Sequence, residues 1–231
     1  DLHLSIRRQR QMCIRDSIRI DHFNGIAKYW KVPAGSSTAM NGEWAEGPGE
    51  NLLEEIFNCF DVNAIIAEDL GEAEQEAAEL KNKYGIPGMK ILQFAFGNGH
   101  KSYPHNYPEN CVVYTGTHDN DTTIGWFHSH PGAGNIQTKN EIKAERKEVL
   151  KYLETDGKEI HWDMIKTALS SKANRVIIPL QDILGLDSSA RMNVPGTVFG
   201  NWRWRFDWAI LTEEKMHRMK SLTTKFNRNH I

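Results

Sequence analysis

Short apolar runs alternate with amphipathic segments along most of the chain. The apolar runs predict strands at residues 18–20, 62–67, 88–96, 111–115 and 175–180. Segments whose apolar side chains recur every three or four positions predict helices at residues 50–60, 72–84, 121–128, 136–155, 162–171 and 212–226. Strands that alternate with helices favour an α/β fold with parallel strands.

The number of predicted strands narrows the architecture. A closed (β/α)8 barrel has eight strands in about 250 residues, whereas about five strands are visible in this chain of 231 residues. We therefore expect an α/β fold of the (β/α)8 TIM-barrel type, present as the C-terminal half of the barrel. Residues 24–50 are rich in Gly, Pro and Trp. We expect them to form a long loop, and such loops in compact domains are usually functional.

The first 17 residues differ from the rest of the chain. Residues 7–17 (RRQRQMCIRDS) resemble the in-frame translation of a common sequencing adapter. The segment is basic, has no periodicity and stops at an apolar strand. We expect residues 1–17 to be such a translation and not native protein, and residues 18–231 to be the C-terminal part of a catalytic barrel. A disordered basic arm is the alternative.

Charge and hydropathy exclude some function classes. The chain has 28 basic and 30 acidic residues. Residues 1–17 hold four Arg and two Asp, so 24 basic and 28 acidic residues remain and their net charge is −4. A mildly acidic body argues against a nucleic-acid partner. No apolar run approaches the roughly 20 residues of a membrane span, so we expect no membrane partner. Bacterial cytoplasm is the expected location, and a plastid also fits.

Cysteine and tryptophan allow two readings each. Cys59 and Cys111 lie in apolar segments, and we expect buried free thiols in a reducing compartment, with a disulfide as the alternative. The seven Trp residues are suited to stacking on sugar rings, although packing in the core is the simpler expectation for most of them.

Three acidic residues follow apolar runs: Asp21, Glu68 and Asp119. Side chains at the carboxyl ends of parallel strands converge on one face, where active sites lie. Cleavage or transfer of a glycosidic bond needs two carboxyl groups, one as acid/base and one as nucleophile. The alternative is that these acids cap helices and pair with Arg; Asp119 to Asp121 are N-cap candidates for the helix predicted at residues 121–128.

The surroundings of the acids suggest different tasks. Arg19 is two positions before Asp21 and shares its strand face, so its charge should lower the pKa of Asp21 and keep it ionised. Glu68 has little positive charge nearby, and burial should raise its pKa, which suits a general acid. His118 and Asp119 could bond to sugar hydroxyls. The His residues show no metal-ligand spacing.

Several motifs together resemble one family. They are residues 19–23 (RIDHF), 29–35 (YWKVPAG), 47–49 (GPG), 67–71 (AEDLG), 115–123 (TGTHDNDTT), 190–197 (ARMNVPGT) and 201–204 (NWRW). The chain from residue 18 onward resembles the 4-α-glucanotransferases, also called amylomaltases, of glycoside hydrolase family 77. The resemblance implies a (β/α)8 barrel and a retaining double displacement on α-1,4-glucans such as maltodextrins, starch and glycogen, with glucose as an acceptor. It implies no metal or organic cofactor.

The resemblance also assigns roles to residues. Asp21 would be the nucleophile, Glu68 the acid/base, and Asp119 the group that holds ring hydroxyls in the transition state. The substrate-binding residues would be Arg19 and His118 beside the acids, Asn193 in the donor site, and His22. From the aromatic loop we add Trp44 as a candidate wall of the acceptor site.

Some expectations remain open at this stage. Retention requires the carboxyl groups of Asp21 and Glu68 to lie about 5–5.5 Å apart. Because the first half of the barrel is missing from the expected fold, we expect the chain alone to be poorly folded or inactive. The alternatives are an α-glucan hydrolase, a debranching-type transferase and a non-catalytic glucan-binding protein.

Overall fold

A computed structural model describes residues 17–71, 74–97, 103–132 and 137–228. The segment expected to be an adapter translation lies outside the described residues, except for Ser17. The first residues of the helices predicted from positions 72 and 136 also lie outside the described residues. The chain divides into two compact units, residues 1–89 and 90–231.

The first unit is built on two parallel strands. β1 (Ile18–Ile20) pairs with β4 (Ile65–Ala67), with Ile18 opposite Ile65 and Ile20 opposite Ala67. Helices α2 (Asn24–Ala27), α3 (Gly49–Phe57) and α4 (Glu74–Lys83) accompany them, and a 3-10 helix (Val62–Ala64) leads into β4. Their apolar faces share one core around Phe23, Leu53, Ile65, Ala67 and Ile86. This core fixes the ends of β1 and β4, after which Asp21 and Glu68 follow.

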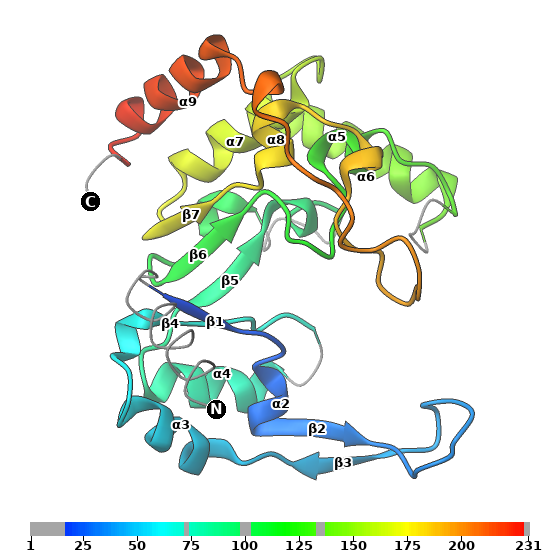
Figure 1. The fold of residues 1–231 in the computed structure, drawn as a ribbon, viewed down its shortest axis with the longest axis vertical. Coiled ribbons are helices and arrows are strands. Elements are labelled where there is room, and N and C mark those ends of the chain that lie inside the picture. Colours follow the sequence, from blue (N-terminus) through cyan, green and yellow to red (C-terminus); the bar gives the residue numbers. More distant parts are fainter. Residues whose placement is uncertain (1–16, 72–73, 98–102, 133–136, 229–231) are drawn as a thin grey trace. The chain divides into compact units, whose positions relative to one another are not determined.

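The region predicted to be a loop at residues 24–50 is largely a β-hairpin, and the prediction was wrong. After α2, strands β2 (Lys28–Lys31) and β3 (Glu43–Glu46) pair antiparallel, with Trp30 opposite Trp44. The hairpin projects away from the helices of its unit (Figure 1). The strands are short and exposed, so the period-two pattern that marks a half-buried strand is weak.

The second unit contains a three-stranded sheet in the order β5-β6-β7. β5 is Gly88–Ile91, β6 is Cys111–Tyr114 and β7 is Arg175–Ile177; β6 and β7 are parallel, with Val112 opposite Arg175. The helices are α5 (Thr123–Phe127), α6 (Lys139–Leu153), α7 (Ile160–Ser170), α8 (Leu180–Leu184) and α9 (Glu213–Lys225). Figure 1 shows β5, β6 and β7 side by side, with α7 and α8 next to β7. Short 3-10 helices lie at Leu92–Phe94, Pro104–Asn106, Ser188–Ala190 and Trp208–Ile210.

Local sequence explains where two of these helices begin. Thr138 and Glu141 form a capping box at the start of α6, each side chain bonding to the other residue's backbone amide. The N-cap of α5 is Thr122, whose hydroxyl accepts from the amide of Gly125 at 3.1 Å. The N-cap expected among Asp119 to Asp121 was therefore wrong. Those residues form the loop between β6 and α5.

Two strands and one helix also differ from the prediction. The strand predicted at residues 88–96 ends at Ile91 and continues as a 3-10 helix, and the one predicted at 175–180 ends at Ile177. The short helix α8 was not predicted. It begins after Pro179, which cannot continue a strand ladder and is tolerated at a helix start.

Burial corrects the expectations for cysteine and tryptophan. Cys111 is buried, but Cys59 is exposed, and both are free thiols. Of the seven Trp residues only Trp162 is buried, so core packing does not account for most of them. Exposed Trp residues are Trp30, Trp44, Trp202 and Trp208. Within the described residues, no helix is long and apolar enough to span a membrane.

Candidate active site

The first unit places Asp21 and Glu68 after its two paired strands. Arg19 donates from Nη2 to Oδ1 of Asp21, so the predicted proximity of this cation is confirmed. The Asp21 side chain is 67% exposed, which leaves its second oxygen open to solvent or to a ligand. An exposed carboxylate with a free face is accessible to a substrate, as a nucleophile must be.

Glu68 is held by backbone amides on both sides. Its Oε2 accepts from the amide of His22 at 2.7 Å, and its Oε1 accepts from the amide of Leu70 at 3.2 Å. His22 has a φ of +50°, a left-handed conformation that is uncommon for residues other than glycine. The turn at His22 therefore presents its amide to the carboxyl of Glu68, directly after Asp21.

The electrostatic surroundings of Glu68 oppose ionisation. Burial raises its pKa, and the negative charge of Asp21 adds to that effect. The hydrogen bonds from the backbone amides of His22 and Leu70, and the charge of Arg19, lower the pKa of Glu68, but its net shift is upward. The expected direction is thus confirmed. A carboxyl group whose pKa is raised by burial suits the role of the acid beside a second carboxyl group that acts as nucleophile.

Asp69 anchors the turn that follows Glu68. Its carboxylate accepts from Lys81 Nζ of α4 at 2.5 Å and from the amide of Met89 at 2.8 Å. Both side chains of this ion pair are mostly buried. A Cβ atom at Gly88 would clash with the Asp69 carboxylate and with Lys81 Nζ, so a larger residue there would displace this ion pair. Sequence reasoning did not assign this role to Asp69, although its place beside Glu68 after a buried strand was a signal.

The second unit surrounds Asp119 with polar groups. Asn193 Nδ2 donates to Oδ1 of Asp119 at 2.5 Å, and His118 Nε2 lies 3.3 Å from its Oδ2. Arg191 Nη2 donates to the backbone carbonyl of Asp119 at 2.7 Å. The predicted residues His118, Asp119 and Asn193 therefore come together. Arg191 was in a quoted motif but had no assigned role.

The loop that carries Asp119 is fixed at both ends by one buried carboxyl group. Asp182 of α8 is 1% exposed. It accepts from the amide of Thr123 at 2.7 Å and from the hydroxyl of Thr115 at 2.5 Å. Burial raises the pKa of Asp182, against the hydrogen bonds from Thr115 and Thr123. Sequence reasoning missed this residue.

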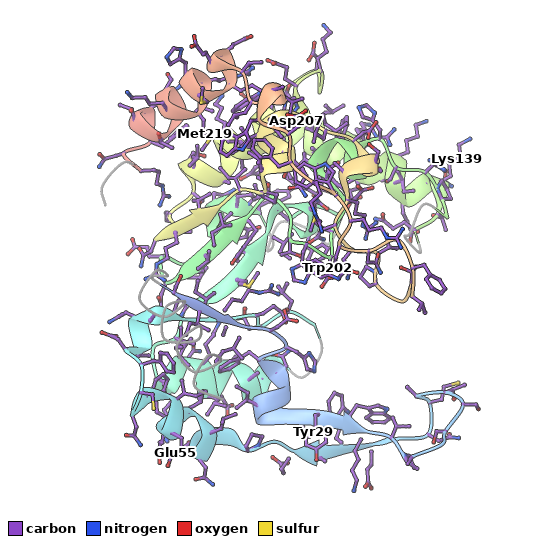
Figure 2. The ribbon with its side chains drawn as sticks, in the orientation of Figure 1. Tyr29, Glu55, Lys139, Trp202, Asp207 and Met219 are labelled. Carbon is purple, nitrogen blue, oxygen red and sulfur yellow. The ribbon has the colours of Figure 1, made fainter. Side chains whose placement is uncertain are left out.

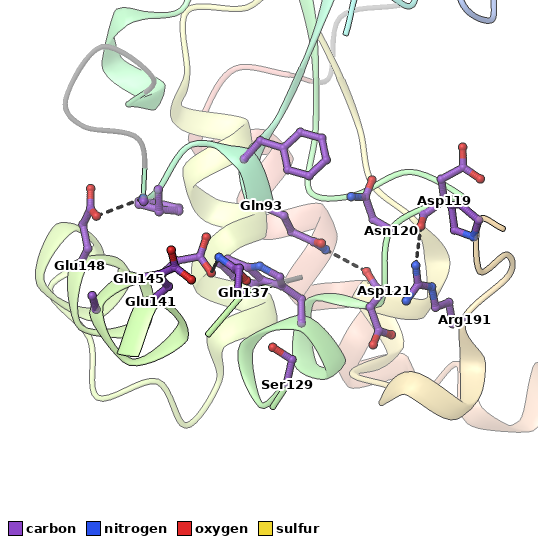
Figure 3. A pocket seen from close by; sticks show the side chains of 16 residues that line it. Gln93, Asp119, Asn120, Asp121, Ser129, Gln137, Glu141, Glu145, Glu148 and Arg191 are labelled. Atoms are coloured by element: carbon purple, nitrogen blue, oxygen red, sulfur yellow. Dashed lines mark hydrogen bonds between the residues drawn. The ribbon is translucent and has the colours of Figure 1, made fainter. Parts of the chain in front are cut away.

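A pocket of about 650 Å³ opens beside the Asp119 loop (Figure 3). Within it, Gln93 Nε2 donates to the carbonyl of Asp121 at 2.9 Å. This bond links the 3-10 helix that follows β5 to the loop that carries Asp119. The wall away from the loop is part of α6. The lining residues are Gln93, Phe94, Phe96, Gly97, Asp119, Asn120, Asp121, Trp126, Ser129, Gln137, Glu141, Ala144, Glu145, Glu148, Arg191 and Pro195. Polar groups and aromatic rings in one pocket suit a sugar.

Trp44, the candidate acceptor-site residue, lies on the hairpin. Trp44 is 46% exposed, and its ring meets that of Trp30 edge to face, with centroids 5.4 Å apart. Figure 2 shows the hairpin, where Tyr29 is labelled, with its side chains extending to both sides. Across the described ranges, no group of three His, Cys, Asp or Glu side chains is arranged to hold a metal ion.

Comparison with known proteins agrees with the motifs. The profile of the family described as 4-alpha-glucanotransferase, glycoside hydrolase family 77, matches residues 4–212. The chain is 42% identical to the chloroplastic/amyloplastic 4-alpha-glucanotransferase of Oryza sativa, over 96% of this chain and 36% of that protein. It is 47% identical to the enzyme of Synechocystis, over 83% of this chain and 37% of the relative. Both alignments cover less than two fifths of the relative's length.

A solved structure is similar along almost the whole chain. Amylomaltase from Streptococcus agalactiae, solved in complex with acarbose, has a TM-score of 0.83 and 35% identity over 96% of this chain and 43% of that one. The expected fold class, part of a (β/α)8 TIM-barrel, is confirmed by this likeness. The origin of residues 1–17 stays a prediction. On the profile match and the sequence identities, the chain belongs to the 4-alpha-glucanotransferase family, glycoside hydrolase family 77.

Proposed function

We propose that the chain supplies the C-terminal part of a catalytic barrel that transfers segments of α-1,4-glucans. The acceptor is the 4-hydroxyl of another glucan or of glucose. The observation that carries the proposal is the pairing of Asp21 with Glu68. One carboxylate is exposed and ion-paired to Arg19, while the other is half-buried, has a raised pKa and accepts the amide of the next residue after Asp21. Family membership supports the same reaction.

The proposed mechanism is a double displacement. Asp21 attacks the anomeric carbon while Glu68 donates its proton to the leaving glycosidic oxygen, which gives a β-glycosyl-enzyme and a shortened glucan. Glu68, now ionised, removes the proton from an incoming 4-hydroxyl, and attack by that oxygen restores the α-linkage and frees Asp21. We assign Asp119, with Asn193 and His118 on its carboxylate, to the ring hydroxyls of the donor sugar. Arg19 and His22 belong to the same substrate-binding group.

The proposal includes the ligands and the compartment. The Streptococcus agalactiae relative was solved with acarbose, and we expect α-1,4-glucans to bind here as maltodextrins, starch or glycogen. Relatives come from bacteria and, by their printed names, from chloroplasts or amyloplasts. We propose the bacterial cytoplasm, with a plastid as the alternative.

Incubation with maltotriose tests the function. The 231-residue chain is assayed as it stands and joined, from residue 18, to the N-terminal part of an active relative. A ladder of longer maltodextrins together with glucose is expected from the joined protein, whereas the chain alone is expected to be poorly folded or inactive. Glucose and maltose without longer chains would indicate a hydrolase instead. A protein that is folded and binds maltodextrins without turnover would contradict catalysis.

Glu68→Gln tests whether Glu68 donates the proton to the leaving glycosidic oxygen. Transfer between natural glucans should fall by about 10²–10⁴-fold, because the leaving oxygen loses its proton donor. Formation of the glycosyl-enzyme from α-maltosyl fluoride should fall much less, since fluoride leaves without a proton. The measurement is the burst of released fluoride. Glu55→Gln, an exposed glutamate in α3, is the control.

The raised pKa of Glu68 also predicts a pH dependence. Glu68 must carry its proton in the first step, so transfer decreases as pH rises through its pKa, which burial holds above the usual range. The fluoride burst of Glu68→Gln should show no such decrease. If the fluoride burst of Glu68→Gln still decreased as pH rises, the decrease would belong to another titrating group.

Trp44→Ala tests the acceptor wall. If the indole holds an acceptor sugar, its loss favours water as the acceptor, and the transfer-to-hydrolysis ratio should fall about tenfold, which corresponds to about 1.4 kcal/mol of stacking. Product analysis by chain length measures the ratio. Trp208→Ala, another exposed Trp, is the control. An unchanged ratio in Trp44→Ala would remove the residue from the acceptor site.

A further inference from the structure

Trp202 adopts a backbone conformation that large residues rarely use. Its φ is +62°, in the left-handed region where a Cβ atom crowds the following carbonyl. Two hydrogen bonds hold it there: its amide donates to the carbonyl of Met192 at 2.7 Å, and its carbonyl accepts from Arg205 Nη1 at 3.0 Å. Conformations of this kind persist only where surrounding structure enforces them, and they cluster at functional sites.

The Trp202 ring lies against a residue of the candidate site. Its centroid is 5.2 Å from that of the His118 imidazole, with 35° between the planes. His118 Nε2 in turn lies 3.3 Å from Oδ2 of Asp119. Trp202 is 52% exposed, so about half of its surface is not buried in a core. Figure 2 shows Trp202 on the loop that precedes Asp207.

The backbone of Trp202 supports the other side of the same carboxylate. Met192, whose carbonyl it binds, directly precedes Asn193, and Asn193 Nδ2 donates to Oδ1 of Asp119 at 2.5 Å. Asn193 also donates its backbone amide to the carbonyl of His118 at 3.1 Å. Trp202 therefore contacts His118 through its ring, and its amide binds the residue that directly precedes Asn193.

We propose that Trp202 is a positioning residue that sets the orientation of His118, and through it of the Asp119 carboxylate, toward the donor sugar. The proposal rests on the function proposed above. If the backbone bond alone mattered, glycine would serve better at this φ, because it has no Cβ to crowd. The presence of a large aromatic side chain at a position that favours glycine indicates that the ring has a use of its own.

Three variants separate the ring from the backbone. Trp202→Gly and Trp202→Ala both remove the ring, but only glycine relieves the left-handed conformation, so Trp202→Gly should melt at the higher temperature of the two. Both should lower kcat for maltotriose disproportionation by about 10–100-fold with little change in KM, because a catalytic group is misplaced. Trp202→Phe keeps a ring against His118 and should retain most of the wild-type kcat.

A spectroscopic measurement accompanies the kinetics in the same preparation. The imidazole proton resonances of His118 should move when the indole is removed, since they lose its ring current, and should stay near their wild-type positions in Trp202→Phe. This readout needs no turnover, so it tests the contact even if the wild-type protein transfers no glucan. Failure of transfer by the wild-type chain joined to the N-terminal part of an active relative would count against the proposed function alone.

Three results would overturn the proposal. One is a Trp202→Gly protein with wild-type kcat, which would show that only the backbone turn matters. Another is a set of His118 resonances that is the same in Trp202→Gly and in wild type. A loss of kcat that merely follows the folded fraction of each variant would likewise assign Trp202 to stability.

Discussion

Replacing Asp21 with asparagine is expected to lower glucan transfer by on the order of 10⁴-fold, because the amide cannot form the glycosyl-enzyme. Folding should be almost unaffected. The side chain is 67% exposed and its ion pair with Arg19 lies at the surface, where such pairs contribute little. Loss of turnover in a protein with an unchanged melting curve would therefore report on chemistry. The measurement is the initial rate of maltodextrin formation from maltotriose.

A matched control and a chemical rescue sharpen the test. Asp61→Asn changes an exposed aspartate of the same unit that caps a 3-10 helix through the amide of Asn63, and it should keep wild-type activity. Asp21→Gly should accept azide as an external nucleophile with α-maltosyl fluoride as donor: azide displaces fluoride and gives a β-glycosyl azide. An α-azide, or a transfer rate for Asp21→Asn within tenfold of wild type, would show that Asp21 is not the nucleophile.

The local parts of the first unit could be predicted from the sequence. The spacing of Arg19 and Asp21 placed them on one strand face, and their ion pair follows from that spacing alone. The upward direction of the Glu68 pKa followed from a buried strand end with few cations nearby. The amide of His22 that binds Glu68 could not be predicted, because it depends on a left-handed turn at a residue that is not glycine.

Features that depend on distant pairing were missed. The hairpin at residues 28–46 joins two short exposed strands through a Gly-rich connection, and only the register reveals that Trp30 faces Trp44. Trp202 reaches His118 across 84 positions of the chain, and its positive φ has no signal in residue type. Asp182 lies 67 positions from its partner Thr115, so their contact could not be read from the sequence. It lies in the first turn of a helix that begins after Pro179, where an acidic residue is typical of ordinary helices.

Asp182 carries the largest expected effect on stability. Asp182→Ala should lower the free energy of unfolding by about 2–6 kcal/mol, since the buried amide of Thr123 and the hydroxyl of Thr115 both lose their acceptor and each such loss costs about 1–3 kcal/mol. The loop that carries Asp119 is tied at both ends by these bonds, so activity should fall as well. Urea unfolding measures the change. Asp187→Asn, a fully exposed helix cap near by, should have little effect.

Asp182→Asn tests whether the negative charge of Asp182 stabilises or destabilises the folded protein. Asparagine can still accept from the Thr123 amide and can donate to the Thr115 hydroxyl, so both bonds have a replacement. Burial raises the pKa of Asp182 in the folded state, so its favourable contribution is complete at low pH and is lost as pH rises through that pKa. The stability of wild type relative to Asp182→Asn should therefore decrease from acidic to neutral pH. A difference that is constant over this range would mean that Asp182 is accommodated as an ion, and that hydrogen bonding outweighs the cost of burying its charge.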